Sequence, residues 1–173
     1  DSLATLKKQV FDDGTFTMER ILSAVANNFA GEEFLRQTII NRTPFFGNDD
    51  DYADDIAIRI YHDLLAAIDG KPNTKGDSFH LNMLSTTCHI YFGKMLGATP
   101  NGRFAFKSIS DGTSPSHGAD SHGPSAVIRS LTKFDHTLSG GILLNQRFLP
   151  SLLKRDEDIK KLGQLVRSYF TLG

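Results

Sequence analysis

The chain has 173 residues, 39% of them hydrophobic, which suits one domain with a single buried core. Its 19 basic and 20 acidic side chains leave a net charge of -1 without a polybasic run, which argues against a nucleic-acid partner. No apolar stretch approaches the roughly 20 residues of a membrane span, and the single cysteine, Cys88, excludes a disulfide framework and suits a reducing cytoplasm.

Two helices are expected in the first 45 residues. Thr17 is a suitable N-cap, and apolar residues then recur at helical spacing until Gly31 stops the pattern. A shorter helix is expected over residues 32 to 41. It ends before Pro44, because the residue that precedes a proline is pushed out of helical geometry.

The clearest helical pattern follows and ends at Gly70. Its apolar residues repeat every four positions: Ile56, Ile60, Leu64 and Ile68. Asp49, Asp50 and Asp51 crowd its start, where exposed N–H groups and the helix dipole favour negative charge. Capping is the preferred interpretation of these carboxylates, and a hard-metal site is the weaker one, because a calcium loop needs further ligands at fixed spacing.

The second half of the chain differs from the first half in residue composition. Residues 79 to 92 are rich in aromatic and β-branched side chains, which favours a buried strand interrupted near Ser85. The stretch from Gly93 to Gly141 holds eight of the fifteen glycines. An irregular segment of this length is usually functional or packed beneath other elements.

Three elements are expected after this point. They are a short helix over residues 125 to 133 opened by Pro124, a second buried strand over 142 to 149, and a last helix over 156 to 172. The side chains of the last helix expected to face inward are Ile159, Leu162, Val166, Tyr169 and Phe170. One segment, 1–173, is therefore expected, helical over 1–70 and built of strand, loop and helix over 77–173.

The glycine-rich loop contains residue types that catalyse reactions in other proteins. Ser114, Ser116, His117 and Asp120 could form a hydrolase triad, but no GxSxG elbow surrounds either serine. His117, Asp120 and His122 could form a metal trio, but zinc ligands usually lie on rigid elements. Chance composition is the better explanation of both sets.

Three side chains in the first expected strand need separate treatment. A reactive cysteine requires a polarised, partly open setting, whereas Cys88 is interpreted as a small buried hydrophobe. Thr86 and Thr87 would point to opposite faces of a strand, so one of them could meet a polar ligand. A hydroxyl bonded to nearby backbone explains them equally well.

Three motifs carry a family resemblance over most of the chain. Residues 97–131, GATPNGRFAFKSISDGTSPSHGADSHGPSAVIRSL, resemble the pattern GA-x-P-[DN]-GR…-S-[DE]-G-x-SP…-GP-[ST]-A-V-[IL]-[KR]-S of glycyl radical enzymes of the pyruvate formate-lyase type. Residues 140–150, GGILLNQRFLP, and 46–54, FGNDDDYAD, are similar to two further signatures of this family. Residues 82–103 and 109–127 are most similar to its dehydratase branch, which acts on trans-4-hydroxy-L-proline or on small polyols such as glycerol.

The resemblance implies a fold of the α/β class and a mechanism for the parent enzyme. The fold is a ten-stranded α/β barrel with outer helices and a long glycine-rich loop, in which this chain would supply two strands. A partner activase, using S-adenosylmethionine and an iron–sulfur cluster, would install a radical on a backbone glycine. That radical would oxidise a cysteine, whose thiyl radical takes hydrogen from an enclosed substrate. In the dehydratases a carboxylate base and an acid then assist departure of a hydroxyl.

The radical-bearing residues are expected to lie outside this chain. Its sequence begins on Asp1 without a signal core and contains no RVxGY-like glycine motif, and Cys88 does not match the family's cysteine loop. No catalytic residue, metal or directly bound cofactor is therefore assigned. By position, the resemblance implies that Thr86, and less directly Thr87, contacts the substrate.

The expected function is that of a segment, inert by itself, of a cytoplasmic radical C–O lyase. Its partners would be the rest of the parent enzyme, the activase, a small polar substrate and a second copy of the parent in a homodimer. A formate C-acetyltransferase or a choline lyase-type enzyme is the alternative within the family. A stand-alone binding or spare-part module, or a hydrolase or metalloprotein built on the SPSHGADSH loop, is the alternative outside it.

Overall fold

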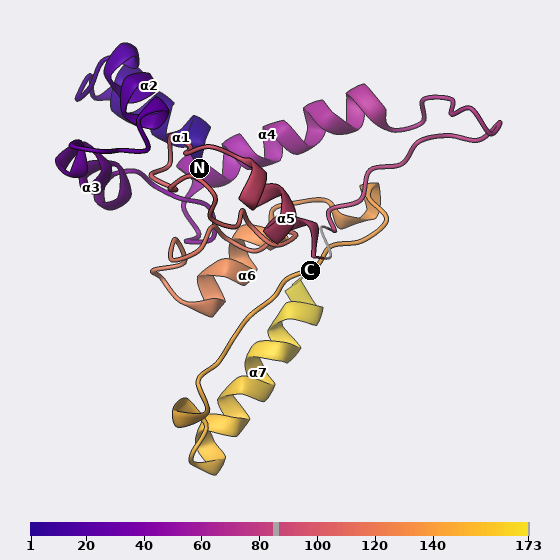
Figure 1. Cartoon of the computed structure of the whole chain (residues 1–173). Helices are drawn as coiled ribbons and strands as arrows, with labels where there is room; N and C mark the ends of the chain where they lie inside the picture. Colours follow the sequence, from indigo (N-terminus) through magenta and orange to yellow (C-terminus); the bar gives the residue numbers. More distant parts are fainter. Residues whose placement is uncertain (85–86, 173) are drawn as a thin grey trace.

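A computed structural model describes residues 1–84 and 87–172. In chain order its elements are α1 (Ser2–Leu6), the π-helical turn η1 (Lys7–Asp12), α2 (Met18–Ala26), α3 (Glu33–Arg42), α4 (Asp51–Ile68), α5 (Cys88–Met95), α6 (Pro124–Thr132), the 3₁₀ turns η2 (His136–Leu138) and η3 (Pro150–Leu152), and α7 (Asp156–Leu172). In Figure 1, α1, α2 and α3 gather at one end, and α4 leads away from them to a projecting hairpin. α7 extends in a different direction, beyond the glycine-rich loops.

The core of the chain lies among the N-terminal helices. The Thr17 hydroxyl accepts a hydrogen bond from the backbone N–H of Arg20 at 3.2 Å, which confirms Thr17 as the N-cap of α2. The buried side chains of this core are Phe16, Ile21, Ala24, Phe29, Leu35, Ile39 and Phe45. The glycine-rich loop reaches the same core, because Phe104 packs edge to face on Phe29 with ring centroids 6.2 Å apart.

α4 starts as predicted, but its apolar stripe is open. The carboxylate of Asp50 accepts a hydrogen bond from the N–H of Tyr52 at 2.9 Å, so the predicted capping role is confirmed for Asp50. Ile60 and Leu64 of the four-residue repeat are 39% and 44% exposed, whereas Tyr61 beside them is buried. The repeat therefore predicts the helix correctly, while the described residues leave much of the face that it marks uncovered.

The two predicted strands are wrong as regular strands. The second half of the segment 79 to 92 is helix α5, and residues 142–149 form no ladder. The strand-like contact between these two segments is a single parallel bridge from Met83 to Ile142. A strand needs neighbours for its backbone N–H and C=O groups, and the described part of the chain offers these segments one bridge instead of a sheet. The described residues are mostly helical.

α5 forms where a strand was expected, and it packs on the following loop through a close approach that only glycine permits. A Cβ atom on Gly93 would lie 2.5 Å from the carbonyl oxygen of Lys107 and 2.5 Å from the Cα of Ser108. The helix thus packs directly on the backbone of the following loop.

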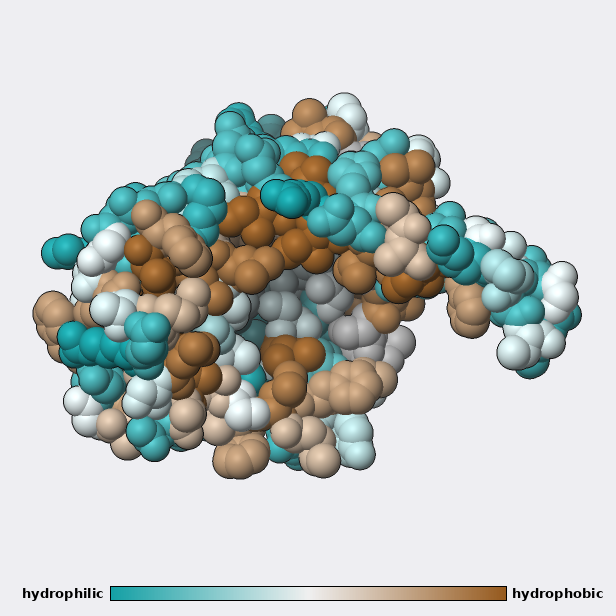
Figure 2. Space-filling view, turned by 90° about the horizontal axis from the view of Figure 1, so that it is seen from above, coloured by the Kyte–Doolittle hydropathy of each residue, from teal (hydrophilic) through white to brown (hydrophobic). Residues whose placement is uncertain are grey.

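The C-terminal helices form at the predicted places. α6 begins with Pro124 at its first position, as expected. The inward face predicted for α7 is wrong, because α7 has no buried residue and Phe170 is 77% exposed. Figure 2 shows hydrophobic side chains gathered across the middle of one face of the molecule. Over the described residues, no helix has both the length and the apolar character needed to cross a membrane.

Candidate functional site

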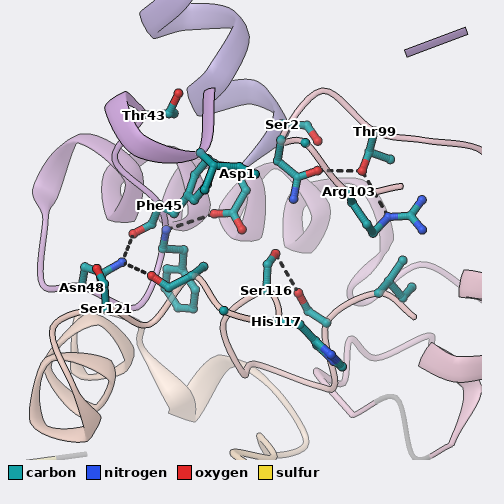
Figure 3. A pocket seen from close by; sticks show the side chains of 18 of the residues that line it. Asp1, Ser2, Thr43, Phe45, Asn48, Thr99, Arg103, Ser116, His117 and Ser121 are labelled. Atoms are coloured by element: carbon teal, nitrogen blue, oxygen red, sulfur yellow. Dashed lines mark hydrogen bonds between the residues drawn. The ribbon is translucent and has the colours of Figure 1, made fainter. Parts of the chain in front are cut away.

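A broad cleft lies between the end of α3, the turn before α4 and the glycine-rich loop. Its volume is about 1070 Å³. Figure 3 shows Asn48 and Ser121 at one side of the cleft and Thr99 and Arg103 at the other, with Ser116 and His117 between them. Two of the three sequence motifs, FGNDDDYAD and the long glycine-rich run, therefore meet in this cleft.

Arg103 closes one wall of the cleft by binding its own loop. Its Nε donates to the hydroxyl of Thr99 at 3.1 Å, Nη2 donates to the carbonyl of Gly97 at 2.5 Å, and Nη1 donates to the carbonyl of Lys107 at 2.6 Å. Burial lowers the pKa of the Arg103 guanidinium from its usual value. Because most of the N–H donors of Arg103 bind acceptors within the loop, this residue shapes the wall of the cleft.

Asn48 joins the two motifs at the other side. Its Nδ2 donates to the carbonyls of Phe45 at 3.0 Å and of Ala119 at 2.7 Å. Its Oδ1 accepts from the hydroxyl of Ser121 at 3.2 Å and from the N–H of His122 at 3.0 Å. The side chain is 9% exposed, and both ends of its amide are bonded. Asn48 lies within the FGNDDDYAD motif, but the motif alone predicts no role for it; its buried amide joins two turns through four hydrogen bonds.

The acidic start of α4 binds a lysine. The Nζ of Lys133 lies 2.6 Å from Asp51, 2.7 Å from Asp54 and 3.2 Å from Asp49. Asp54 is completely buried and also accepts a hydrogen bond from Ser130 at 2.9 Å. Desolvation opposes the charge of Lys133, but the hydrogen bonds that its ammonium donates to these carboxylates outweigh this effect and raise the pKa of Lys133 well above its usual value.

This ion cluster lies where the sequence left a hard-metal site as the weaker interpretation of Asp49, Asp50 and Asp51. The ammonium of Lys133 occupies the position between the carboxylates that a cation would take. The hydrogen bond from Lys133, helped by Arg129, lowers the pKa of Asp49. Within residues 1–84 and 87–172, no three His, Cys, Asp or Glu side chains are placed to hold a metal ion. The cluster fastens α4 to α6.

The structure does not assemble a triad in the SPSHGADSH loop. The Ser114 hydroxyl accepts from the N–H of Asn145 at 3.0 Å, and the Ser116 hydroxyl lies 3.2 Å from that of Ser110. His117 is exposed, and over the described residues no hydrogen bond joins it to either serine.

The metal trio in the same loop is not assembled either. The Nδ1 of His122 lies 3.0 Å from the backbone carbonyl of Asn48, and its backbone is held by the same residue. The described residues therefore bring neither set of loop side chains together.

Of the two expected substrate-binding threonines, the structure describes only Thr87. Thr86 lies outside the described residues, and Thr87 is exposed directly before the helix, where its side chain makes no capping hydrogen bond. Cys88 is exposed at the first position of α5, so its interpretation as a buried hydrophobe is wrong. The interpretation failed because it assumed a strand, whereas the helix turns this side chain to the surface.

A polar group that sequence reasoning missed lies next to these residues. The Nδ1 of His89 is 3.4 Å from Asp111, and the two side chains are only 13% and 19% exposed. Asp111 also accepts a hydrogen bond from the side-chain amide of Asn145. The pattern gave no signal for this group, because its three members come from distant parts of the chain.

An apolar cavity of about 460 Å³ lies beside this region. The α4 stripe lines it with Ile60 and Leu64, and Met83 and Phe134 contribute from elsewhere. It joins the open face of α4 to the segment that precedes the two threonines.

Two family models match the chain. The model described as pyruvate formate lyase-like matches residues 1–93, and the model described as glycine radical matches residues 109–173. Together they cover most of the chain and leave residues 94–108 between them unmatched. The division into residues 1–70 and 77–173 stays a prediction.

Curated relatives match along the whole chain. The trans-4-hydroxy-L-proline dehydratase of Clostridioides difficile is 45% identical over 172 residues, which are 99% of this chain and 22% of that protein. The isethionate sulfite-lyase of Oleidesulfovibrio alaskensis is 37% identical over 177 residues, 99% of this chain and 21% of that protein. The chain thus spans about a fifth of the length of these relatives.

Solved structures agree with this likeness. The hydroxyproline dehydratase from Clostridioides difficile with trans-4-hydroxy-L-proline bound matches with a TM-score of 0.94 at 45% identity. The glycerol-bound B12-independent glycerol dehydratase from Clostridium butyricum matches with a TM-score of 0.90 at 37% identity. Each match covers 99% of this chain and 22% of the solved chain.

Proposed function

The chain belongs to the pyruvate formate lyase-like family, and from this membership we propose that it is a segment of a glycyl radical C–O lyase. The parent enzyme removes a hydroxyl from a small polar substrate. The preferred candidate substrate is trans-4-hydroxy-L-proline, and the second candidate is glycerol or a small diol. The observation that carries the proposal is the likeness to hydroxyproline dehydratase over 99% of the chain, at 45% identity and a TM-score of 0.94.

In the parent enzyme the chain is part of the wall of an α/β barrel. The parallel bridge between Met83 and Ile142 supports this placement, because neighbouring strands of such a barrel run parallel. The open apolar stripe of α4 supports it as well, since a surface of this kind is normally covered. The rest of the parent polypeptide supplies the missing strands and covers these faces.

Thr86 and Thr87 contact the substrate in this proposal. A hydroxyl beside a polar substrate group can donate or accept one hydrogen bond, and Thr87 lies exposed at the start of α5. The residues of this chain thus bind and orient the substrate, and the surrounding wall excludes water from it.

The radical itself is supplied from outside these residues. A partner activase with S-adenosylmethionine and an iron–sulfur cluster installs it on a glycine of the parent enzyme. The donor set of this chain does not suit such a cluster, which is held by several cysteine thiolates, because its sequence contains one cysteine. We therefore place the cluster on the activase and give these residues no catalytic role. The parent works in the cytoplasm as a homodimer.

A second candidate is a C–S lyase that releases sulfite. The 37% identity to isethionate sulfite-lyase over 99% of the chain favours it. A formate C-acetyltransferase or choline lyase-type parent, and a spare-part module, remain the alternatives expected from the sequence.

The test uses the complete reading frame that contains this segment, purified anaerobically after co-expression with its activase. Electron paramagnetic resonance measures the radical, and products are followed with trans-4-hydroxy-L-proline, glycerol, propane-1,2-diol, isethionate, choline and pyruvate with coenzyme A. The proposal expects a radical and dehydration of hydroxyproline. Sulfite release from isethionate without any dehydration would establish the second candidate instead, and a frame no longer than this chain would favour the module.

A further inference from the structure

We propose that Thr5 and Gln9 form a binding site for one internal water molecule, beside the turn that leads into the cleft. Thr5 lies in α1 and Gln9 lies in the π-helical turn η1, and both residues are 0% exposed. A spacing of four residues places the two side chains on one face of the helical segment, one turn apart. The site is independent of the proposed function, since it lies in the packed interior of this chain.

Each of the two side chains buries a polar atom that the protein leaves unbonded. Among the described residues, no group forms a hydrogen bond with Oγ1 of Thr5 or with Oε1 of Gln9. Buried polar groups in folded proteins are nearly always bonded, either to protein or to ordered water. Because both residues are 0% exposed, the described chain itself encloses these atoms. One water molecule between them supplies a partner for each.

The hydroxyl of Thr5 differs from those of other helical threonines in the chain. The hydroxyls of Thr38 and Thr171 donate to the carbonyl four residues earlier, at 2.8 and 2.9 Å. The equivalent carbonyl for Thr5 is that of Asp1, which accepts the backbone N–H of Thr5 at 2.8 Å. Over the described residues the hydroxyl of Thr5 does not share this acceptor. It is thus available to a different partner.

The amide of Gln9 determines how the water is bound. Its Nε2 donates to the hydroxyl of Thr43 at 3.1 Å inside the core, and its Oε1 is an acceptor. The water therefore donates one hydrogen to Oε1 of Gln9 and forms its second bond with the hydroxyl of Thr5. With the amide turned over, Thr43 donates to Oε1 and the water accepts from Nε2. Water satisfies the site in both orientations, because it can donate and accept.

Thr43 connects this site to the cleft. It lines the cleft of about 1070 Å³ and is 7% exposed, which gives water a path to Gln9. The side chains of Thr5, Gln9 and Thr43 are neutral, and a buried ion needs an opposite charge beside it. Leu6 and Val10, which follow Thr5 and Gln9 in sequence, pack against the apolar core. Water therefore suits the site better than an ion.

The bound water strengthens the attachment of the first helical segment to the turn after α3. Gln9 bonds the side chain of Thr43 at this turn, and the carboxylate of Asp1 accepts a hydrogen bond from the N–H of Phe46 at 3.0 Å. The water adds Thr5 to the same set of contacts. The turn that begins the FGNDDDYAD motif is therefore held by protein groups and by water together.

The experiment uses the complete polypeptide that contains this chain, and three variants of it. Thr5→Val keeps the shape of the side chain but removes the hydroxyl, and Thr5→Ser keeps the hydroxyl. Thr38→Val is the control, because the hydroxyl of Thr38 already has a protein acceptor. Crystal structures at a resolution that shows ordered water are compared, and hydrogen exchange is measured for the peptide covering residues 2–13.

We expect one ordered water within about 3.2 Å of Thr5 Oγ1 and of the Gln9 amide in the unmodified protein and in Thr5→Ser. Thr5→Val lacks this water, and its 2–13 peptide exchanges about fivefold faster, the effect of one lost hydrogen bond. Thr38→Val keeps the water, and exchange of the same peptide stays within about twofold of the unmodified protein.

A crystal structure of the unmodified protein in which protein groups bond both atoms, or in which no water lies between them, would overturn the proposal. Equal exchange of the 2–13 peptide in Thr5→Val and Thr5→Ser would overturn it as well. Where Thr5→Val yields no folded protein, the unmodified protein and Thr5→Ser decide, because the water must be present in both. The substrate and radical assays of the proposed function do not depend on these outcomes, so the two can fail separately.

Discussion

Replacing Lys133 by methionine tests the ion cluster that fastens α4 to α6. Methionine keeps the length of the side chain but removes the ammonium from Asp54, which is completely buried, while Lys133 itself is 23% exposed. Breaking a buried ion pair by removing one partner costs about 3–5 kcal/mol. Since Ser130 still donates to Asp54, we expect a loss near the lower limit, about 3 kcal/mol.

Urea denaturation and thermal melting of the 173-residue chain measure this loss in the free energy of unfolding. For a domain of this size, about 3 kcal/mol corresponds to a decrease in Tm of roughly 6–12 °C. Asp54→Asn removes the buried charge, so Lys133→Met in that background should cost only about 1 kcal/mol, a coupling of about 2 kcal/mol. The control is Arg59→Met, whose pair with Asp63 is 85% and 74% exposed and should contribute under about 1 kcal/mol. Equal effects of Lys133→Met and Arg59→Met would refute the reasoning.

The same cluster predicts a pH dependence with two limits. The pKa of Asp49 is lowered in the folded chain, so its contribution to stability is present above the unfolded value near 4 and is lost as pH falls. The pKa of Lys133 is raised, so its contribution is present below the unfolded value near 10.4 and is lost as pH rises beyond it. We expect the alkaline decrease to be smaller in Lys133→Met, measured by denaturation at pH 7 and above 10; an identical alkaline decrease in both proteins would contradict this assignment.

Further substitutions test the cleft and the close contact between α5 and the loop that follows it. Asn48→Ala leaves the buried carbonyls of Phe45 and Ala119 without their donor, and should cost about 2–3 kcal/mol and speed hydrogen exchange over residues 116–122. Arg103→Lys keeps the charge but cannot reach the same acceptors at once, and a loss of about 2 kcal/mol in urea denaturation is expected. Gly93→Ala should lower the free energy of unfolding by about 1–3 kcal/mol, because the added methyl group overlaps the backbone of Lys107 and Ser108. Gly97→Ala is the control, because its added methyl group meets no atom. Equal melting temperatures for the two variants would contradict the close approach at Gly93.

Local features of the structure were predictable from the sequence. The cap at Thr17, the start of α4 at Asp50 and the opening of α6 by Pro124 depend on residues within one or two turns, and all three are confirmed. The family followed from motifs that lie together in the sequence, and the family model confirms it.

Features that depend on distant residues were not predictable. The composition of residues 79 to 92 indicated a strand, but Gly93 permits α5 to pack on the backbone of Lys107, and no composition reveals that contact. The α7 periodicity marked an apolar face and could not show that the described residues leave this face without a buried side chain. The contacts of Asp111 with His89 and Asn145 could not be predicted for the same reason.

The most direct test of the central claim is an electron paramagnetic resonance measurement on two samples treated with the same activase and S-adenosylmethionine. One sample contains the complete parent enzyme, and the other contains the 173-residue chain with its helical content checked by circular dichroism. We predict a glycyl radical signal in the parent and none in the 173-residue chain. A radical signal from the chain alone would show that these residues carry the chemistry, and would contradict their assignment as barrel wall and substrate contact.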